Sequence, residues 1–110
     1  VKSLLFSAGD DFILCLVSGD KRCSLKTLKK ILDEKDVSMA NPDDVKKITG
    51  YTIGGVSPVG HLNKVKIFVD TNLERFSTVF AAAGHPNCVF KIQFNQLVKL
   101  TSGEIKEIAE

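Results

Sequence analysis

The chain has 110 residues, of which 44% are hydrophobic and 25% are charged, and its net charge is +2. This composition indicates a globular chain that can bury one hydrophobic core, and it excludes a disordered chain. The apolar runs are too short to cross a bilayer, so a membrane-spanning chain is excluded as well. The small net charge permits only a local basic face for binding an anionic partner.

The N-terminal half of the sequence predicts two strands and two helices. "VKSLLF" and "FILCLVSG" are apolar runs joined by the turn signal "AGDD", and together they predict a hairpin. "SLKTLKKILDEK" has helical spacing, with Ser24 as its N-cap. "NPDDVKKITG" predicts a second helix, which Asn41 caps, Pro42 begins and Gly50 ends.

The C-terminal half predicts three more strands and two short helical segments. In "KVKIFVD", alternation directs Val65, Ile67 and Val69 toward the core and Phe68 toward the other face. "NLERF" is expected to form a helical turn, and "STVFAAAG" and "CVFKIQF" are expected to form strands around the turn "GHPN". "NQLVKLT" predicts a short helix before the final "EIKEIAE". The interspersed elements predict a mixed sheet with helices packed against it.

Cysteines and histidines give no sign of a metal centre. Cys15, Cys23 and Cys88 are an odd number without C-x-x-C spacing, which argues against a disulfide framework and fits a reducing cytosol. Cys15 lies in "FILCLV" and is expected to be a buried small hydrophobe rather than a reactive thiol. His61 and His85 lack metal-ligand spacing. We therefore expect no metal and no cofactor.

The segment "TGYTIGGVSPVGH", residues 49–61, combines glycines and a proline with apolar side chains. Glycines let a backbone approach a ligand closely, and successive exposed N–H groups form a concavity for an anion or a carbonyl. A packed turn is the alternative interpretation. No pattern pairs Ser57 with a base, so we expect it to form a turn rather than to act as a nucleophile.

The sequence leaves two possible roles open for Lys2, and two others for the basic residues around the first predicted helix. Alternation in "VKSLLF" places Lys2 on the face of Leu4 and Phe6. Such a lysine either keeps its head in water at the strand end or points into a pocket, where it binds or polarises a carbonyl. Around the first predicted helix, the basic residues form either a solvated face or a set of phosphate contacts. They are Lys21, Arg22, Lys26 and Lys30.

The order of these pieces resembles the YbaK family of aminoacyl-tRNA deacylases, also called the prolyl-tRNA-synthetase-associated or insertion-domain family. The match runs from "VKSLLF" through "TGYTIGGVSPVGH" to "FAAAGHPNCVFKIQFNQLVKLT", and the T-G-Y-x-x-G-G-x-S-P-x-G block is its most specific part. The resemblance implies one α/β domain of α+β type over residues 1–110, with a curved, mostly antiparallel mixed sheet. The helix and strand that precede the lysine strand in family members are absent from this sequence.

The resemblance also implies a function. Family members hydrolyse mischarged tRNA, here expected to be proline tRNA carrying a small amino acid such as alanine, serine or cysteine. They use neither a metal nor a protein nucleophile. The implied partners are the tRNA acceptor end and prolyl-tRNA synthetase, in the cytoplasm. The alternatives are a non-catalytic module that binds tRNA or a synthetase, and an editing domain excised from a larger synthetase.

The family motifs assign roles to individual positions. Lys2 matches the essential lysine, and the backbone at Gly54 and Gly55 is expected to bind the aminoacyl group. At Gln96 the sequence departs from the cysteine-specific members, so the resemblance leaves the amino acid open. The position of His85 fits either a pocket residue or a turn residue beside Pro86. The implied substrate-binding residues are Val56, Ser57, Pro58, Gly84 and His85.

Overall fold

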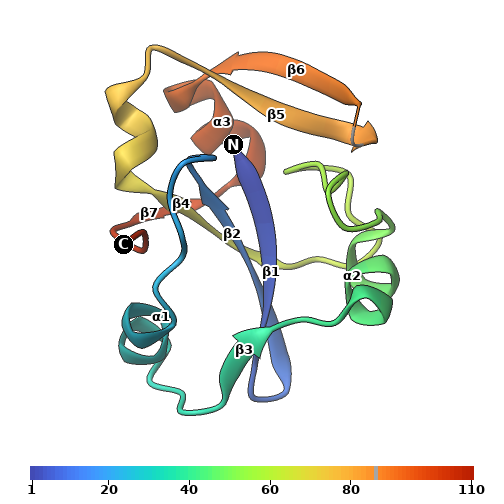
Figure 1. Cartoon of the computed structure of the whole chain (residues 1–110), viewed down its shortest axis with the longest axis vertical. Helices are drawn as coiled ribbons and strands as arrows, with labels where there is room; N and C mark the ends of the chain where they lie inside the picture. Colours follow the sequence, from blue (N-terminus) through green and yellow to red (C-terminus); the bar gives the residue numbers. More distant parts are fainter. Residues whose placement is uncertain (86) are drawn as a thin grey trace.

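The computed structural model describes residues 1–85 and 87–110 (Figure 1). Three α-helices and a short 3-10 helix, η1, alternate with strands along these residues. The elements are β1 (Lys2–Ala8), β2 (Asp11–Val17), α1 (Leu25–Leu32), β3 (Val37–Met39), α2 (Pro42–Thr49), β4 (Lys66–Asp70), η1 (Thr71–Arg75), β5 (Thr78–His85), β6 (Cys88–Gln93), α3 (Phe94–Thr101) and β7 (Glu104–Lys106). Among the described residues, no helix is long and apolar enough to cross a membrane.

The predicted N-terminal hairpin is confirmed. β1 and β2 pair antiparallel along their whole length, from Lys2 opposite Val17 to Ala8 opposite Asp11. Gly9 lies in the connecting turn with a φ of 59°, a left-handed conformation that costs glycine little. The hairpin holds the first residues of the chain in a fixed position beside the centre of the sheet.

The main sheet has the strand order β3-β1-β2-β4-β7 and is mixed, as expected. β1 pairs antiparallel with β2 and β3, whereas β4 pairs parallel with β2 and β7. β3 covers only the stretch Phe6–Ala8 of β1, and one further hydrogen bond joins the amide of Ala40 to the carbonyl of Leu5. The edge of β1 at Lys2–Leu4 therefore extends beyond its β3 partner.

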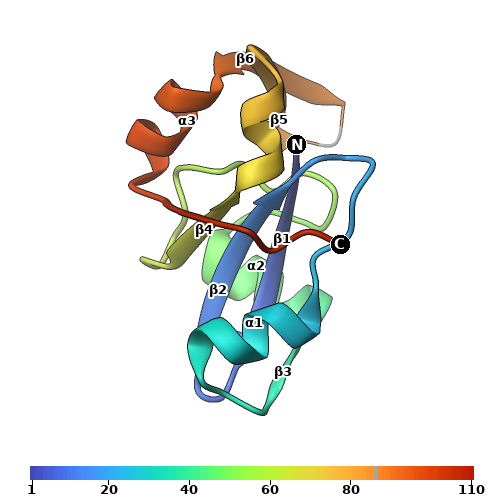
Figure 2. The same cartoon turned by 90° about the vertical axis from the view of Figure 1, so that its left-hand side faces the viewer.

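Helices cover both faces of the main sheet. Figures 1 and 2 show α1 on one side of the β1–β2 hairpin and α2 on the other. Leu28 of α1 packs with Phe6 and Ile108 on the first face, and Val45 of α2 packs with Leu5 on the second. α3 and the separate β5–β6 hairpin also contribute to the second face, which is the face that carries the site described below.

One prediction about β4 is wrong. Phe68 was expected to face away from the core, but its side chain is only 1% exposed and packs on the α1 side of the sheet. Ile67 and Val69 pack on the opposite side, as predicted. β4 is buried on both faces because it lies between two parallel neighbours with elements covering each side, a setting in which strands are apolar throughout.

The helix boundaries follow the predicted capping residues. The Ser24 hydroxyl accepts from the amide of Thr27 at 3.2 Å, and the Asn41 side chain accepts from the amide of Asp44 at 2.8 Å. Gly50 ends α2 with a φ of 84°. Each cap satisfies a backbone group that the helix itself leaves unpaired.

Asp70, at the end of β4, joins the C-terminal segment to the sheet. Its carboxylate is fully buried and accepts hydrogen bonds from the amides of Ile108 and Ala109, at 2.9 and 3.1 Å. It also accepts from the amide of Asn72 at 3.2 Å, which caps η1. A buried carboxylate is tolerated when it accepts several such bonds, so Asp70 fixes two chain segments at once.

Candidate functional site

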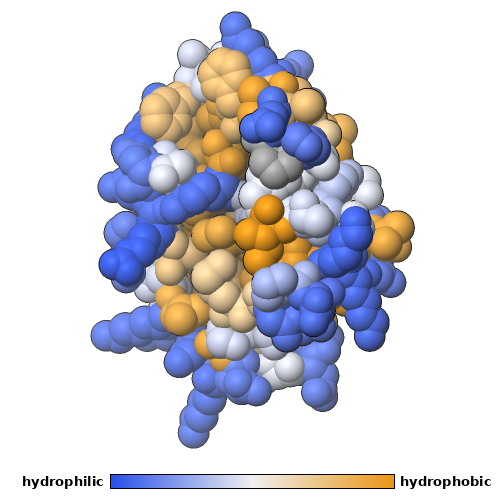
Figure 3. Space-filling view, turned by 45° about the vertical axis from the view of Figure 1, so that its right-hand side comes forward, coloured by the Kyte–Doolittle hydropathy of each residue, from blue (hydrophilic) through white to orange (hydrophobic). Residues whose placement is uncertain are grey.

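A cavity of about 290 Å³ lies between the N-terminal half of β1 and the segment that follows α2. Its walls are mostly apolar, and Met39 and Ile53 are 59% and 57% exposed. Figure 3 turns this side of the molecule forward and shows apolar surface between polar margins. The cavity, called the β1 pocket here, is lined by Val1, Lys2, Ser3, Leu4, Leu5, Met39, Ala40, Val45, Ile53, Gly54, Val56 and Ala82.

The glycine–proline segment forms the wall opposite β1. Gly54 has a φ of 87°, so a side chain at this position would strain the turn. The amide of Gly55 donates to the carbonyl of Thr52 at 2.9 Å and is used within the turn. The amides of Val56 and Ser57, both buried residues, have no acceptor among the described residues. The amide of Gly54 has none either, and Gly54 and Val56 line the β1 pocket whereas Ser57 does not, so the amides of Gly54 and Val56 are the donors that the segment leaves for a ligand there.

The exit of this segment is held by side chains. The Ser57 hydroxyl accepts from the amide of Val59, and the Ser57 carbonyl lies 2.7 Å from Nε2 of His61. Tyr51 donates its hydroxyl to the carbonyl of Val59 at 2.8 Å. Ser57 is thus a turn former, as the sequence indicated, and its side chain is not among those that line the β1 pocket.

Lys2 lines the β1 pocket, but its ammonium group is engaged elsewhere. It lies on the face of Leu4 and Phe6, as predicted, and this face packs toward α1. Its Nζ donates to the carbonyl of Lys21, which precedes α1. Lys2 is therefore part of the pocket wall, but its side chain ends at the segment before α1, and its cation reaches a ligand in the pocket only by leaving the Lys21 carbonyl.

Ser3 is a polar residue of the pocket that sequence reasoning missed. It follows Lys2 and so faces the opposite way, with Leu5, toward the apolar cluster that includes Ala40 and Val56. Its hydroxyl oxygen is buried and has no hydrogen-bond partner in the described part of the chain. The same alternation that was applied to Lys2 would have found it.

The predicted residues Gly84 and His85 end β5 and do not line the β1 pocket. Gly84 has a φ of 93°, and a Cβ there would lie 3.1 Å from the Tyr51 ring. His85 is exposed, and its Nδ1 accepts from the amide of Asn87 at 3.1 Å. The predicted turn around them includes Pro86, which lies outside the described residues.

The four basic residues around α1 fall into two pairs. Lys21 and Arg22 lie between β2 and α1, where the Lys21 carbonyl contacts Lys2. Lys26 and Lys30 are exposed on α1, on the face of the sheet opposite the β1 pocket (Figure 2). The first pair is therefore better placed than the second to contact a ligand that enters the pocket.

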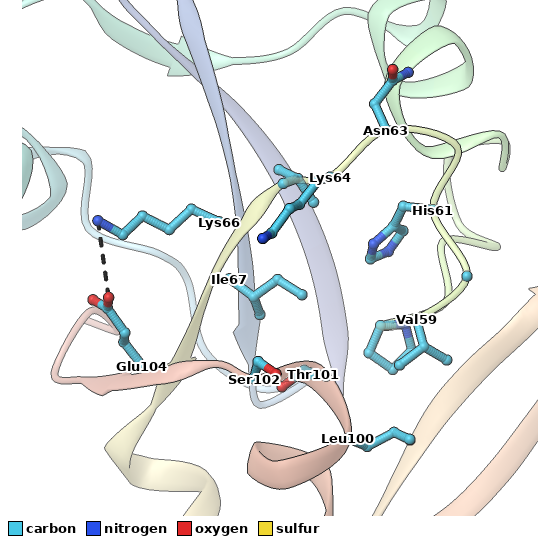
Figure 4. Close-up of a pocket in the computed structure, with 13 residues that line it drawn as sticks. Val59, His61, Asn63, Lys64, Lys66, Ile67, Leu100, Thr101, Ser102 and Glu104 are labelled. Atoms are coloured by element: carbon cyan, nitrogen blue, oxygen red, sulfur yellow. Dashed lines mark ion pairs between the residues drawn. The ribbon is translucent and has the colours of Figure 1, made fainter.

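A second, larger cavity of about 710 Å³ lies beyond Pro58, which was predicted to bind substrate (Figure 4). Lys64, His61 and Ser102 line it, and an ion pair of 4.0 Å joins Lys66 to Glu104 at its edge. Of the residues predicted for the site, only Pro58 borders this cavity. Size favours the larger cavity, but the β1 pocket combines an apolar interior with Lys2 and the glycine segment, so it is the candidate site.

Metal-binding side chains do not gather in the described residues: no group of three or more His, Cys, Asp or Glu is placed to hold an ion. Cys15 is fully buried, as predicted. A hydrogen bond with Cys23 and burial both raise the pKa of the Cys15 thiol.

For binding a ligand, the described part of the β1 pocket offers backbone amides, one hydroxyl and one lysine.

The chain belongs to the aminoacyl-tRNA editing domain family, which matches residues 1–100. It is 38% identical over 91 residues to the proline--tRNA ligase of Lactobacillus acidophilus, covering 83% of this chain and 16% of that protein. It is 26% identical over 96 residues to EbsC of Enterococcus faecalis, a proposed Cys-tRNA(Pro)/Cys-tRNA(Cys) deacylase, covering 87% of this chain and 58% of that protein.

A solved structure has the same fold. It is described as a proposed trans-editing enzyme for prolyl-tRNA synthetase, and it superposes with a TM-score of 0.96 at 34% identity. The superposition covers 100% of this chain and 69% of the other. The family resemblance and the mixed α/β fold predicted from the sequence are thereby confirmed.

Proposed function

We propose that this chain is an aminoacyl-tRNA deacylase, which removes a small amino acid such as alanine, serine or cysteine from mischarged proline tRNA. Family membership supports an editing role, and the relatives described as acting on Cys-tRNA(Pro) or with prolyl-tRNA synthetase support the choice of tRNA. The observation that carries the proposal is an apolar cavity lined by Gly54 and Val56, whose amides have no acceptor among the described residues. The proposed setting is the cytoplasm, with prolyl-tRNA synthetase as a further partner.

The proposed reaction is ester hydrolysis. Water adds to the ester carbonyl carbon, the bond between that carbon and the ribose oxygen breaks, and the products are the free amino acid and tRNA with a free terminal hydroxyl. The amides of Gly54 and Val56 are the proposed donors to the carbonyl oxygen, on which negative charge develops. One such donor contributes about 3 kcal/mol to stabilising the transition state. Lys2, once released from Lys21, adds a positive charge near that oxygen.

The position of the acyl group also places the rest of the substrate. The ester joins the amino acid to the terminal ribose, so the terminal adenosine would lie just outside the pocket. The exposed side chains of Met39 and Ile53 border the pocket and offer apolar surface to that nucleoside. The preceding phosphates would then reach the basic residues that follow β2.

Charge removal at the two basic pairs should have unequal effects on tRNA binding. A plot of log affinity against log salt concentration has a negative slope. Replacing both Lys21 and Arg22 with alanine should make that slope less steep by about two, because roughly one phosphate contact is lost per residue. The double alanine variant of Lys26 and Lys30 should have a smaller effect, because α1 lies across the sheet. Filter binding or fluorescence titration at several salt concentrations measures both. Equal slopes for the two variants would contradict this path for the tRNA.

A panel of charged tRNAs tests the proposed activity. Proline tRNA carrying alanine, serine, cysteine, threonine or proline is incubated with the protein, and release of each amino acid is measured against a blank. We expect the small amino acids to be released and prolyl-tRNA to be hydrolysed ~10-fold more slowly, because a difference of one methylene in an apolar pocket is worth about 1–3 kcal/mol. Tight, salt-sensitive binding of tRNA without release of any amino acid would instead favour a non-catalytic module.

A further inference from the structure

The unpartnered hydroxyl of Ser3 distinguishes it from the other hydroxyl groups buried in the chain. Buried polar groups in proteins nearly always have a hydrogen-bond partner, and an exception requires an explanation. Ser18, Ser24, Thr49 and Ser57 are buried residues whose hydroxyls bond to Asp20, Thr27, Val45 and Val59, respectively. The Ser3 hydroxyl has no such bond among the described residues, and Ser3 lines a cavity.

The surroundings of Ser3 indicate what kind of group would complete its bonding. Leu5, Ala40, Val45 and Val56 share its face of the sheet and offer no side-chain hydrogen bond. An alanyl group in this pocket would meet only apolar partners. A seryl group, which adds one hydroxyl to the same carbon skeleton, would bring a partner to the Ser3 oxygen after rotation about the Ser3 Cα–Cβ bond.

We propose that Ser3 determines specificity in the β1 pocket, by hydrogen bonding to a hydroxyl on the side chain of the bound acyl group. This inference rests on the proposed deacylase function and adds a preference for seryl over alanyl esters. An apolar pocket alone cannot separate the two, since it does not strongly reject an analogue that merely adds a hydroxyl. Ser3, which carries the one buried side-chain hydroxyl among the described residues of its wall, supplies the discrimination.

The test compares two substrates that differ only in the amino acid. kcat/KM is measured for proline tRNA charged with serine and with alanine, using the unaltered protein, Ser3→Ala and Ser3→Thr. We expect the unaltered protein to favour the seryl substrate by about tenfold, which corresponds to about 1.4 kcal/mol. Ser3→Ala should remove that preference by slowing the seryl substrate about tenfold, with the alanyl rate within about twofold. Ser3→Thr retains a hydroxyl and should retain the preference.

Two controls separate this role from a structural one. Ser38→Ala removes an exposed serine from the neighbouring strand β3 and should change neither rate. The melting temperature of Ser3→Ala should not fall, because the hydroxyl makes no hydrogen bond within the described protein. Equal slowing of both substrates, or no change in either, overturns the role of Ser3 and leaves the deacylase function standing. Absence of hydrolysis by the unaltered protein overturns both.

Discussion

Lys2→Met is expected to lower kcat/KM for alanyl-tRNA by about 100-fold while the protein remains folded. Methionine preserves the length and packing of the side chain but removes the charge, which the proposed mechanism uses to stabilise the developing oxyanion. The hydrogen bond from Lys2 to the Lys21 carbonyl is also lost, at a cost of about 1 kcal/mol in stability. Single-turnover deacylation and a melting curve, recorded on the same preparation, measure the two effects separately.

The contact with Lys21 makes the control for this experiment important. If Lys2 acts only by holding the Lys21 segment in place, Lys2→Met should lower the melting temperature and weaken tRNA binding, with kcat unchanged. If Lys2 acts on the ester, kcat should fall and the melting temperature should change by only a few degrees. Lys91→Met, a substitution at an exposed lysine of β6, is the matched control and should leave the rate unaltered. Undiminished kcat in Lys2→Met would remove the proposed catalytic role.

Asp70→Ala is expected to cause the largest loss of stability, about 3–5 kcal/mol in the free energy of unfolding. Three backbone amides lose a charged acceptor, and two of them belong to the C-terminal residues Ile108 and Ala109. Asp70→Asn retains one oxygen that can accept from both C-terminal amides, so its loss should be smaller. Urea unfolding measures each value.

An exposed carboxylate provides the comparison for Asp70. Asp36→Ala alters an exposed aspartate between α1 and β3 and should change the free energy of unfolding by less than about 0.5 kcal/mol. A loss below about 1 kcal/mol in Asp70→Ala would show that the C-terminal segment contributes little to the fold. Because Asp70 does not line the β1 pocket, the rate per folded molecule should remain unchanged.

Elements with local signals were predictable from the sequence. The caps at Ser24 and Asn41 and the end of α2 at Gly50 depend on residues within one helical turn, and all three were predicted correctly. β3 was not predicted, because three residues of strand carry too little periodicity to distinguish them from a loop. The burial of Phe68 depends on parallel neighbours distant in sequence, which alternation within one strand does not reveal.

The candidate site was predictable in part, for a related reason. The family resemblance assigned Lys2, Gly54 and Val56 to one site, and these three residues do line one cavity. The direction of the Lys2 ammonium depends on the carbonyl of Lys21, which only the three-dimensional path of the chain brings within reach. The unpaired Ser3 hydroxyl is likewise evident only when all its neighbours are known.

The two sides of the β1 pocket differ in how substitution can alter them. Side chains form its apolar lining, so single codon changes at Ala40, Val45 or Ala82 can reshape the space within it. The amides of Gly54 and Val56 belong to the peptide chain, and both survive almost any exchange of the Val56 side chain, provided that Gly54 preserves the bend. Related sequences can therefore diverge in the acyl groups they admit while inheriting the same means of holding the carbonyl.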